Sequence, residues 1–518
     1  MKRDVNGLAA TPLDLLIIGG GAYGVCAAWE AALRGLSVGL VERGDFGEAT
    51  SSNSLHTMHG GLRYLQHLDI RRMRESIRER RFWLRAAPEL ITPMPFVLPT
   101  FGHGLRGPEV LQSALMLNDL ISCDRNALVS AGARLPRGRR LSREAARQAF
   151  GALRIAGFNG AALWYDGFNS SPERLLIALL QAASDAGARV ANYCAAEALE
   201  CSGGRVVGAV VRDQLDGRQH PIRARCVLNA TGPWVDTIAT MAGRRSGEPL
   251  FRPSRAMNLV VPRLPFEAAI GIPAPRSGQE LDSVLDKGAV TYFIMPWGDY
   301  SLIGTKHLRC APGIGAHGIA AAEVEQFLKE INPVLGDLRI AARDVIAVKS
   351  GLLPEKAGAN PAGDVVLQKH SRIVDHQVED GIGGLISIVG VKWTTARLTA
   401  EQSVALALSK LGRSAVPFRR LSRLNVRGAT RDASEEQIRR LAQDELACQL
   451  TDVVFRRTGL GLSRHLDDSV LARLATLLGR ELGWPEVEQE RQQQLVRQEF
   501  ERRAGRSDGS TSQGSIEP

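Results

Sequence analysis

Residues 14–24 read DLLIIGGGAYG, an apolar run of strand length that ends in a cluster of glycines. A helical stretch follows at about 24–34, and residues 36–41 form a second apolar run of strand length. Strand, glycine turn, helix and second strand together occupy the roughly 30 residues that a βαβ unit needs. The segment therefore predicts a Rossmann-type unit, and with it a fold of the α/β class.

The glycine spacing within this turn is Gly19-x-Gly21-x-x-Gly24. Gly19 allows the tight turn, Gly21 lets the backbone approach a pyrophosphate, and Gly24 lets the helix pack closely against the strand. Backbone N–H groups and the helix dipole then favour the negative charge of the pyrophosphate. Glu42 ends the second strand where an acid accepts hydrogen bonds from ribose hydroxyls. These residues predict a dinucleotide site, and taken alone they fit NAD as well as FAD.

Three further segments favour a flavin over a nicotinamide. Small hydroxyl residues and glycines at 49–52 and 59–64 would let the backbone approach an extended cofactor. Residues 228–234 read as a buried strand that returns to the cofactor at the carboxyl end of the sheet. Residues 390–395 would aim a helix N-terminus, with Lys392 beside it, at the pyrimidine end of the isoalloxazine. Positive charge at that end stabilises reduced flavin, so these segments predict FAD.

With these motifs in view, the chain resembles the FAD-dependent glycerol-3-phosphate dehydrogenases, within the wider D-amino-acid-oxidase-like flavoprotein superfamily. The resemblance runs from about residue 13 to about residue 410, and more faintly through 434–462. Its most specific signals are Thr50-Ser51-Ser52, HGGLRYL at 59–65, NATGPW at 229–234, MPWG at 295–298 with IGT at 303–305, and DVVFRRT at 452–458.

The resemblance implies an activity and its partners. The secondary alcohol of sn-glycerol 3-phosphate would be oxidised to dihydroxyacetone phosphate by hydride transfer to FAD. Quinone or dioxygen would then reoxidise the flavin. Members of the family contact the membrane peripherally, so the resemblance implies a cytoplasmic protein that touches the inner face of the membrane.

The predicted site combines residues from several of these segments. His59 is the candidate base for the alcohol proton, with a hydrogen-bonded structural histidine as the alternative. Arg63 would hold the anionic end of the substrate, with an ion pair between domains as the alternative. Lys392 would face flavin or substrate, and Tyr64 and Lys369 would join Arg63 in substrate binding. The predicted cofactor-binding residues are Gly19, Gly21, Gly24, Glu42, Arg43, Thr50, Ser51, Ser52, Gly60, Gly61, Gly232, Trp234, Gly390 and Thr394.

Three positions depart from the family pattern in ways that bear on the substrate. The family usually has a lysine where this chain has His56, and an arginine where it has Leu353. A second family arginine is replaced by Lys369. Family members use such arginines to hold phosphate, for which a guanidinium offers a planar fork, a lysine only a point charge and a leucine nothing. The same flavin chemistry on another polyol phosphate or a hydroxy or amino acid, and a non-catalytic flavin-binding protein, are therefore the alternative functions.

At 518 residues the chain is too long for one hydrophobic core. We predict a Rossmann-type FAD-binding domain, a substrate domain built on an antiparallel sheet, and a small helical C-terminal domain. The FAD-binding domain takes 13–87, 165–243 and 345–410, the substrate domain 88–164 and 244–344, and the helical domain 426–504. Residues 1–11 read as a polar, loosely ordered lead-in, and residues 505–518 as a disordered tail of low complexity.

Composition limits the partners. The net charge of +10 is compatible with acidic small molecules, nucleic acid or an anionic membrane surface, but we find no nucleic-acid motif. The seven cysteines are odd in number and lack metal-type spacing, which predicts reduced thiols in the cytosol and no metal site.

No run of residues is long and apolar enough to span a bilayer. A basic amphipathic helix at about 65–87 offers arginines to anionic lipid, while Glu75 and Glu79 favour a salt-bridged, solvated face instead. At most, then, we expect a peripheral and salt-sensitive membrane contact.

Overall fold

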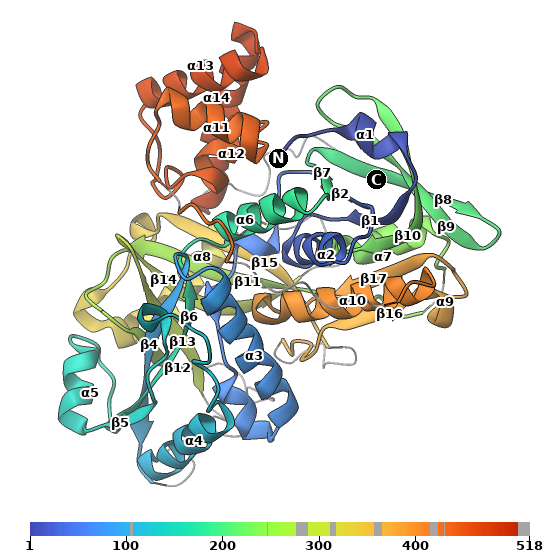
Figure 1. Cartoon of the computed structure of the whole chain (residues 1–518). Coiled ribbons are helices and arrows are strands. Elements are labelled where there is room, and N and C mark those ends of the chain that lie inside the picture. Colours follow the sequence, from blue (N-terminus) through green and yellow to red (C-terminus); the bar gives the residue numbers. More distant parts are fainter. Residues whose placement is uncertain are drawn as a thin grey trace.

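The structure is a computed structural model that describes residues 1–103, 107–245, 247–275, 289–310, 318–356, 365–414, 423–428 and 430–505. Two large sheets and a separate helical cluster make up this part of the chain (Figure 1). Of the tail predicted at 505–518, residues 506–518 lie outside the described residues, and Gly505 is buried. The α/β class predicted from the glycine turn is confirmed.

The first sheet has eight strands and carries the predicted βαβ unit. Its main path runs β16-β17-β10-β1-β2-β7, with the hairpin of β8 and β9 attached through β10. The strands from β17 to β7 are parallel, and β16 is an antiparallel edge. Their bounds are β1 Leu13–Ile18, β2 Val38–Val41, β7 Arg189–Ala191, β8 Cys194–Ser202, β9 Arg205–Asp213, β10 Gln219–Asn229, β16 Arg372–Asp375 and β17 Leu385–Val389.

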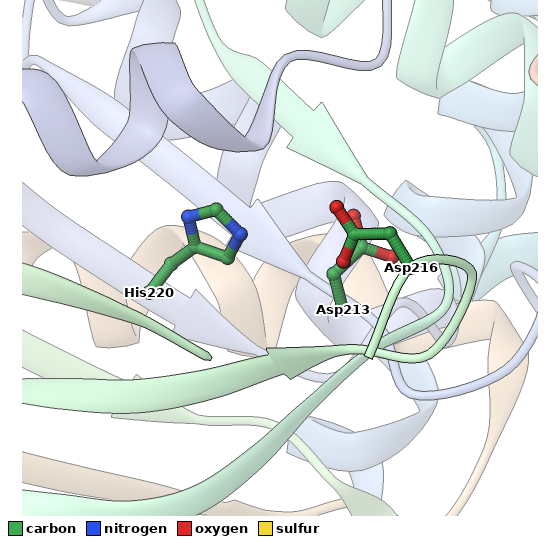
Figure 2. A group of neighbouring side chains, drawn as sticks. All are labelled: Asp213, Asp216 and His220. Carbon is green, nitrogen blue, oxygen red and sulfur yellow. The ribbon is translucent and has the colours of Figure 1, made fainter. Parts of the chain in front are cut away.

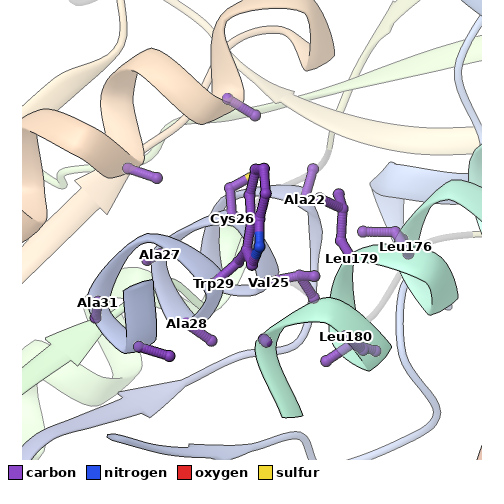
Figure 3. Close-up of a cluster of buried hydrophobic side chains, with 14 of the residues drawn as sticks. Ala22, Val25, Cys26, Ala27, Ala28, Trp29, Ala31, Leu176, Leu179 and Leu180 are labelled. Atoms are coloured by element: carbon purple, nitrogen blue, oxygen red, sulfur yellow. The ribbon is translucent and has the colours of Figure 1, made fainter. Parts of the chain in front are cut away.

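Three helices cover one face of this sheet. Helix α2 (Ala22–Leu33) lies between α6 (Pro172–Asp185) and α10 (Ala396–Lys410) and packs against both. Figure 3 shows that α2 contributes Trp29 and small side chains such as Ala27 and Ala28 to this packing, and that α6 contributes three leucines, Leu176, Leu179 and Leu180. Small side chains on the central helix let three helices pack side by side over a narrow parallel sheet.

The opposite face is covered in part by the N-terminal residues. The expectation that residues 1–11 form a loose lead-in is wrong, because Val5–Ala10 form helix α1 with Asp4 as its N-cap. Val5 and Leu8 are buried, and the Arg3 guanidinium donates to both carboxylate oxygens of Asp213 at 2.8 and 2.7 Å. Helix α7 (Val235–Met241) lies beyond β10 and packs against β8 and β17.

The second sheet has nine strands and is mostly antiparallel, as predicted for the substrate domain. Its order is β15-β11-β14-β13-β12-β4-β6-β3, with β5 paired to β6. Helix α8 (Ala321–Leu335) packs against β12, and α5 (Arg143–Phe150) packs against β6. The strands are β3 Thr57–Met58, β4 Ile91–Phe101, β5 Arg139–Leu141, β6 Phe158–Asn169, β11 Pro253–Pro262, β12 Ala269–Pro275, β13 Ala289–Trp297, β14 Tyr300–Arg309 and β15 Ala347–Pro354.

The chain passes between the two sheets several times. Strands β3 and β15 and the end of β6 pair within the nine-stranded sheet, although they fall in segments predicted for the FAD-binding domain. The 3₁₀ helices η1 (Thr50–Ser52) and η2 (Leu62–His67) lead into α3 (Ile70–Ala86), and α4 (Pro108–Ile121) packs against η2. Two further 3₁₀ helices follow sheet strands, η4 (Gly232–Trp234) after β10 and η7 (Trp393–Thr395) after β17. Helix α9 (His376–Glu379) connects β16 to β17.

The C-terminal helices form a compact cluster of their own, drawn in red above α6 in Figure 1. It contains α11 (Glu435–Glu445), α12 (Leu450–Asp452), a π-helical turn Val453–Arg457, α13 (Asp468–Leu482) and α14 (Glu486–Arg503). Helices α13 and α14 are separated at residues 483–485, and Pro485 is the N-cap of α14.

Buried charges attach this cluster to the Rossmann unit. Asp45, just after β2, accepts hydrogen bonds from Arg456 and Arg457 at 2.5 and 2.7 Å, and all three side chains are buried. Burial alone would raise the pKa of Asp45, but the two guanidinium groups outweigh it and hold that pKa at about 2. On α6, Arg174 pairs with the buried Glu445. Buried ion pairs thus join the Rossmann unit to the C-terminal helices.

Replacing Asp45 by Asn should destabilise the protein by about 3–5 kcal/mol, because two buried guanidinium groups lose their carboxylate. The stabilisation from Asp45 is fully present above the ordinary carboxyl pKa and is lost as pH falls toward about 2. Denaturant unfolding followed by tryptophan fluorescence measures both effects. Glu144→Gln, in the exposed Arg147–Glu144 pair, is the control and should change little. An Asp45→Asn protein as stable as the wild type would contradict the assignment.

Candidate active site

The glycine turn closes over the ends of two parallel strands. Gly19 has a φ of +108°, and a Cβ there would lie 2.6 Å from the carbonyl oxygen of Ala230 at the end of β10. A Cβ on Gly24 would lie 1.9 Å from the carbonyl oxygen of Gly19. Neither position accepts a side chain, so these two glycines have the packing roles that their spacing predicts.

The first turn of α2 is arranged to receive an anion. Gly21 is the N-cap of the helix, and the Ala22 N–H donates to the Ser51 hydroxyl at 2.9 Å. A Cβ on Gly21 would lie 3.1 Å from that same oxygen. Thr50 fixes η1 to β15, since its hydroxyl donates to the Leu352 carbonyl and accepts from the Leu352 N–H, both at 3.0 Å. The helix N-terminus therefore lies beside a hydroxyl-lined turn, as a pyrophosphate requires.

The end of β2 presents the predicted acid. One oxygen of Glu42 accepts from the Gly20 N–H at 2.6 Å and the other from the Gly44 N–H at 2.9 Å. Burial raises the pKa of Glu42 despite these hydrogen bonds. Each carboxylate oxygen keeps a second lone pair that a ribose hydroxyl can use. The Arg43 guanidinium lies 4.0 Å above the ring of Trp234 and so links the end of β2 to η4.

The segment after β17 reaches the same edge of the sheet. The Tyr23 hydroxyl accepts from the backbone N–H groups of Val391 and Lys392 at 2.9 and 3.0 Å, and a Cβ on Gly390 would lie 2.2 Å from the Tyr23 ring. The Trp393 indole donates to the Ser51 carbonyl at 2.9 Å, which ties η7 to η1. Helix α10 then begins directly after η7. This segment therefore brings the start of α10 to the turn that α2 also contacts.

The turn that contains His59 is held by a buried carboxylate. Asp166 of β6 accepts from the Gly60 N–H at 2.6 Å and pairs with Arg80 of α3. Gly61 follows with a φ of +82°, which favours glycine. Burial, together with Lys392, Arg72 and Arg80, lowers the pKa of His59 to about 3. His59 is therefore neutral at physiological pH and able to accept a hydrogen bond or a proton.

The side chain of Lys392 makes two hydrogen bonds within the site. Its ammonium donates to the Tyr64 hydroxyl at 2.9 Å and to the Ser76 hydroxyl at 3.0 Å. Burial and the nearby Arg72 lower the pKa of Lys392 to about 7. The sequence places Lys392 beside the flavin motif, but Ser76 and Arg72, both on α3, were not recognised because that helix was interpreted as a solvated, salt-bridged surface.

His56 lies beside a buried lysine that comes from another strand. His56 is buried between Phe168 and Trp297, and its Nε2 lies 3.0 Å from the ammonium of Lys349 on β15. Lys349 also donates to the Ser52 carbonyl at 2.8 Å and pairs with Glu173 at 3.3 Å. Burial and Lys349 lower the pKa of His56 well below its ordinary value. His56 is thus part of the support behind the turn at residues 50–52.

A cavity of about 290 Å³ opens beside Lys392. It lies between α3, α10 and the segment before β16. The residues that line it are Arg71, Arg72, Glu75, Lys369, His370, Ser371, Lys392, Thr395, Leu398, Thr399 and Gln402. Lys369 lines this cavity, whereas Leu353 is not among the lining residues. The backbone of Arg63 lies in η2, and its side chain lies outside the described residues.

The residues at the sheet edge fit FAD. The turn accepts no side chain at Gly19 or Gly24, and the α2 N-terminus and Glu42 provide complementary groups for a pyrophosphate and a ribose. Among the described residues, the buried Thr394 hydroxyl has no hydrogen-bond partner. A buried polar group without a partner is costly, and a polar cofactor edge would satisfy it.

One cluster away from this site has the composition of a metal site. The ligand atoms of Asp213, Asp216 and His220 lie within 4.8 Å of one another where β9 turns into β10 (Figure 2). Both oxygens of Asp213 already accept hydrogen bonds from Arg3. The guanidinium therefore neutralises this carboxylate, and Asp213 attaches the N-terminus to the end of β9.

Comparison with known proteins identifies relatives over most of the chain. The family described as FAD dependent oxidoreductase matches residues 14–406. A glycerol-3-phosphate dehydrogenase of Synechocystis sp. is 33% identical over 425 residues, covering 80% of this chain and 73% of the relative. The mitochondrial glycerol-3-phosphate dehydrogenase of Homo sapiens is 30% identical over 556 residues, covering 93% of this chain and 72% of the relative.

Solved structures share the fold. The glycerol-3-phosphate dehydrogenase from Bacillus halodurans complexed with FAD aligns with a TM-score of 0.73 at 22% identity, covering 96% of this chain and 97% of that chain. The L-α-glycerophosphate oxidase from Mycoplasma pneumoniae with FAD bound aligns with a TM-score of 0.55 at 15% identity, covering 79% of this chain and 97% of that chain.

Replacing Gly21 by Val should abolish retention of the flavin, because the branched side chain would press on Ser51 and fill the space in front of the α2 N-terminus. Flavin absorbance per mole of protein after gel filtration measures this, with circular dichroism to check folding. Gly132→Val is the control, since a Cβ there meets nothing within 4 Å. A folded Gly21→Val protein with full flavin content would show that the turn has only a structural role.

Proposed function

The chain belongs to the glycerol-3-phosphate dehydrogenase family of FAD-dependent oxidoreductases, and on that premise we propose that it oxidises sn-glycerol 3-phosphate to dihydroxyacetone phosphate. The observation that carries the proposal is the position of the cationic cavity beside Lys392. One wall of this cavity is the segment that follows β17 and approaches the predicted flavin position, and the others carry Arg72 and Lys369. An anionic substrate held there would have its alcohol close to the cofactor motif.

The reaction removes a hydride from the secondary carbon and a proton from its hydroxyl oxygen. FAD supplies the two-electron acceptor, and quinone or dioxygen would take the electrons onward. This chain has to bind the phosphate, orient the carbon, exclude water and accept the hydroxyl proton. Those four tasks fall on the groups that surround Lys392.

We propose that His59 accepts the hydroxyl proton of the substrate. The Asp166–Arg80 pair holds the turn of His59 in place through the N–H of Gly60. A neutral imidazole has a free acceptor nitrogen at physiological pH. The neighbouring cations lower its basicity, as its pKa of about 3 indicates. A bound dianion would offset their repulsion and raise that basicity when substrate is present.

Lys392 would bind the substrate anion and hold Tyr64 in place. Its contacts with the Tyr64 and Ser76 hydroxyls fix the ammonium at the cavity wall. Burial and Arg72 lower the pKa of Lys392 to about 7, so we expect this lysine to titrate near neutral pH in the free protein. Anion binding favours the charged form, which couples substrate affinity to pH.

Anaerobic mixing with glycerol 3-phosphate should bleach the flavin of the wild-type protein, while hydroxy acids should not. The value of kcat/KM should fall as pH rises through about 7, because Lys392 loses its proton in the free enzyme. In Lys392→Arg this decline should disappear, since a guanidinium stays charged. Lys392→Met should lower kcat/KM about ten- to hundredfold, as the loss of a charged hydrogen bond predicts.

The exposed Lys329 on α8 provides the control, and Lys329→Met should leave both the rate and its pH dependence unchanged. A wild-type flavin that glycerol 3-phosphate fails to reduce would disprove the proposed substrate. An unaltered pH profile in Lys392→Arg would show that another group titrates.

We also propose a cytoplasmic location with peripheral contact to anionic lipid. Among the described residues, no helix is long and apolar enough to cross a membrane. Several arginines of α3 are engaged by acids, since Arg74 and Arg81 pair with Asp124 and Arg80 with Asp166. The neighbouring α4 instead exposes apolar side chains, with Met116 and Leu120 one helical turn apart and 64% and 71% exposed. Leu68 at the end of η2 is 76% exposed.

Substituting Met116 and Leu120 together by Ser should reduce co-flotation with anionic lipid vesicles, because exposed apolar side chains supply part of the contact. High salt should weaken wild-type binding to the vesicles. The binding that remains at high salt should be the part that is lost in the variant. Val487→Ser on α14, also an exposed apolar residue, is the matched control. Wild-type protein that fails to float at low salt would remove the membrane proposal.

A further inference from the structure

Two cations share one aromatic ring at the wall of the cavity. The Arg72 guanidinium lies 4.1 Å from the centre of the Tyr64 ring, and the Lys392 ammonium lies 4.7 Å from it. A cation–π contact stabilises each cation when it is considered alone. It does not remove the repulsion between two like charges in a partly dehydrated space.

No described group neutralises Arg72. Its Nε is buried without a hydrogen-bond partner, and its guanidinium forms no ion pair within the described part of the chain. Only its backbone is engaged, because the Arg72 N–H donates to the Asp69 carboxylate at 3.1 Å at the start of α3. A guanidinium offers five donors in a planar fork, so most of the binding capacity of Arg72 is available.

The nearest carboxylates have partners of their own. Glu75, on the cavity wall, pairs with Arg71 at 3.3 Å. Asp69 is the N-cap of α3 and lies 3.5 Å from His370. Burial is the main cause of the lowered pKa values of Lys392 and His59, and the positive charge of Arg72 lowers both further. The cavity therefore carries an arrangement of cations that an anion would stabilise.

The position of Arg72 bears on the missing family arginine. Leu353 lies on β15 and does not line the cavity, whereas Arg72, Lys369 and Lys392 all do. Arg72 comes from a different element and approaches the cavity from the α3 side. A volume of about 290 Å³ is ample for a three-carbon phosphate ester.

We propose that Arg72 is a specificity-determining residue that binds the anionic group of the substrate together with Lys392. It would take the place of the arginine that the family usually has at position 353. The proposal rests on the proposed function and names the residue that recognises its phosphate. The guanidinium of Arg72 on α3 and the ammonium of Lys392 after β17 would bind the anion from two sides. Efficient use of a phosphorylated substrate is then expected despite the leucine on β15.

The test compares wild-type holoenzyme with Arg72→Leu, Arg72→Gln and Arg72→Lys. In the Leu and Gln variants the KM for glycerol 3-phosphate and the inhibition constant of inorganic phosphate should both rise about ten- to hundredfold. The kcat should change far less, since Arg72 contacts the anion and not the reacting carbon. Arg72→Lys should recover part of the affinity. Flavin content and spectrum report whether each variant is correctly folded.

Arg78→Leu is the matched control, because Arg78 is an exposed arginine of the same helix and is not a lining residue of the cavity. Its KM and phosphate inhibition should equal those of the wild type. Folded Arg72→Leu and Arg72→Gln proteins with wild-type phosphate inhibition would overturn the assignment. If glycerol 3-phosphate fails to reduce the wild-type flavin, the proposed function fails. Phosphate binding, read as a shift in melting temperature, then still decides the role of Arg72.

Discussion

The parallel pairing of β1 with β10 is the constraint on which the site depends. The two strands end so close together that a single methyl group on Gly19 would collide with the Ala230 carbonyl. Because the turn has no side chains at its two tightest points, α2 starts directly above the strand ends. β2 and β17 are parallel to them and end at the same edge of the sheet. Glu42 and the segment that leads to Lys392 therefore lie at this edge.

Buried ion pairs then fix the elements that surround this edge. Asp45 ties the turn after β2 to the C-terminal helices, Asp166 with Arg80 supports the turn that contains His59, and Glu79 of α3 pairs with Arg397 of α10 at 2.6 Å. Each pair joins segments far apart in the chain, and each is enclosed by protein. Removing one partner would leave a buried charge, so these pairs limit movement of the segments that hold the cofactor and the substrate.

The local parts of this architecture were predictable from the sequence, and the long-range parts were not. The βαβ unit, the glycine roles and the helical C-terminal region follow from residues close together in the chain. The ordered helix α1 was missed because Val5 and Leu8 are buried against the distant sheet and Arg3 pairs with Asp213. Lys349, which reaches His56, and Arg72, which reaches the Tyr64 ring, were missed for the same reason. Periodicity places a residue on a helix, but only the tertiary fold decides which arginine faces a cavity.

Leu353 shows why a missing motif residue does not settle a substrate. A phosphate needs charge and donors at a point in space, and several elements border the space beside Lys392. A guanidinium on α3 meets that need as well as one on β15, provided that it stays free of carboxylate partners. The ion pairs of Arg74, Arg80 and Arg81 show that most arginines of α3 are engaged elsewhere. Arg72 differs from them because Tyr64, an aromatic ring and not an acid, holds it at the cavity. The substrate is therefore decided by where the cations converge and not by the strand from which each one comes.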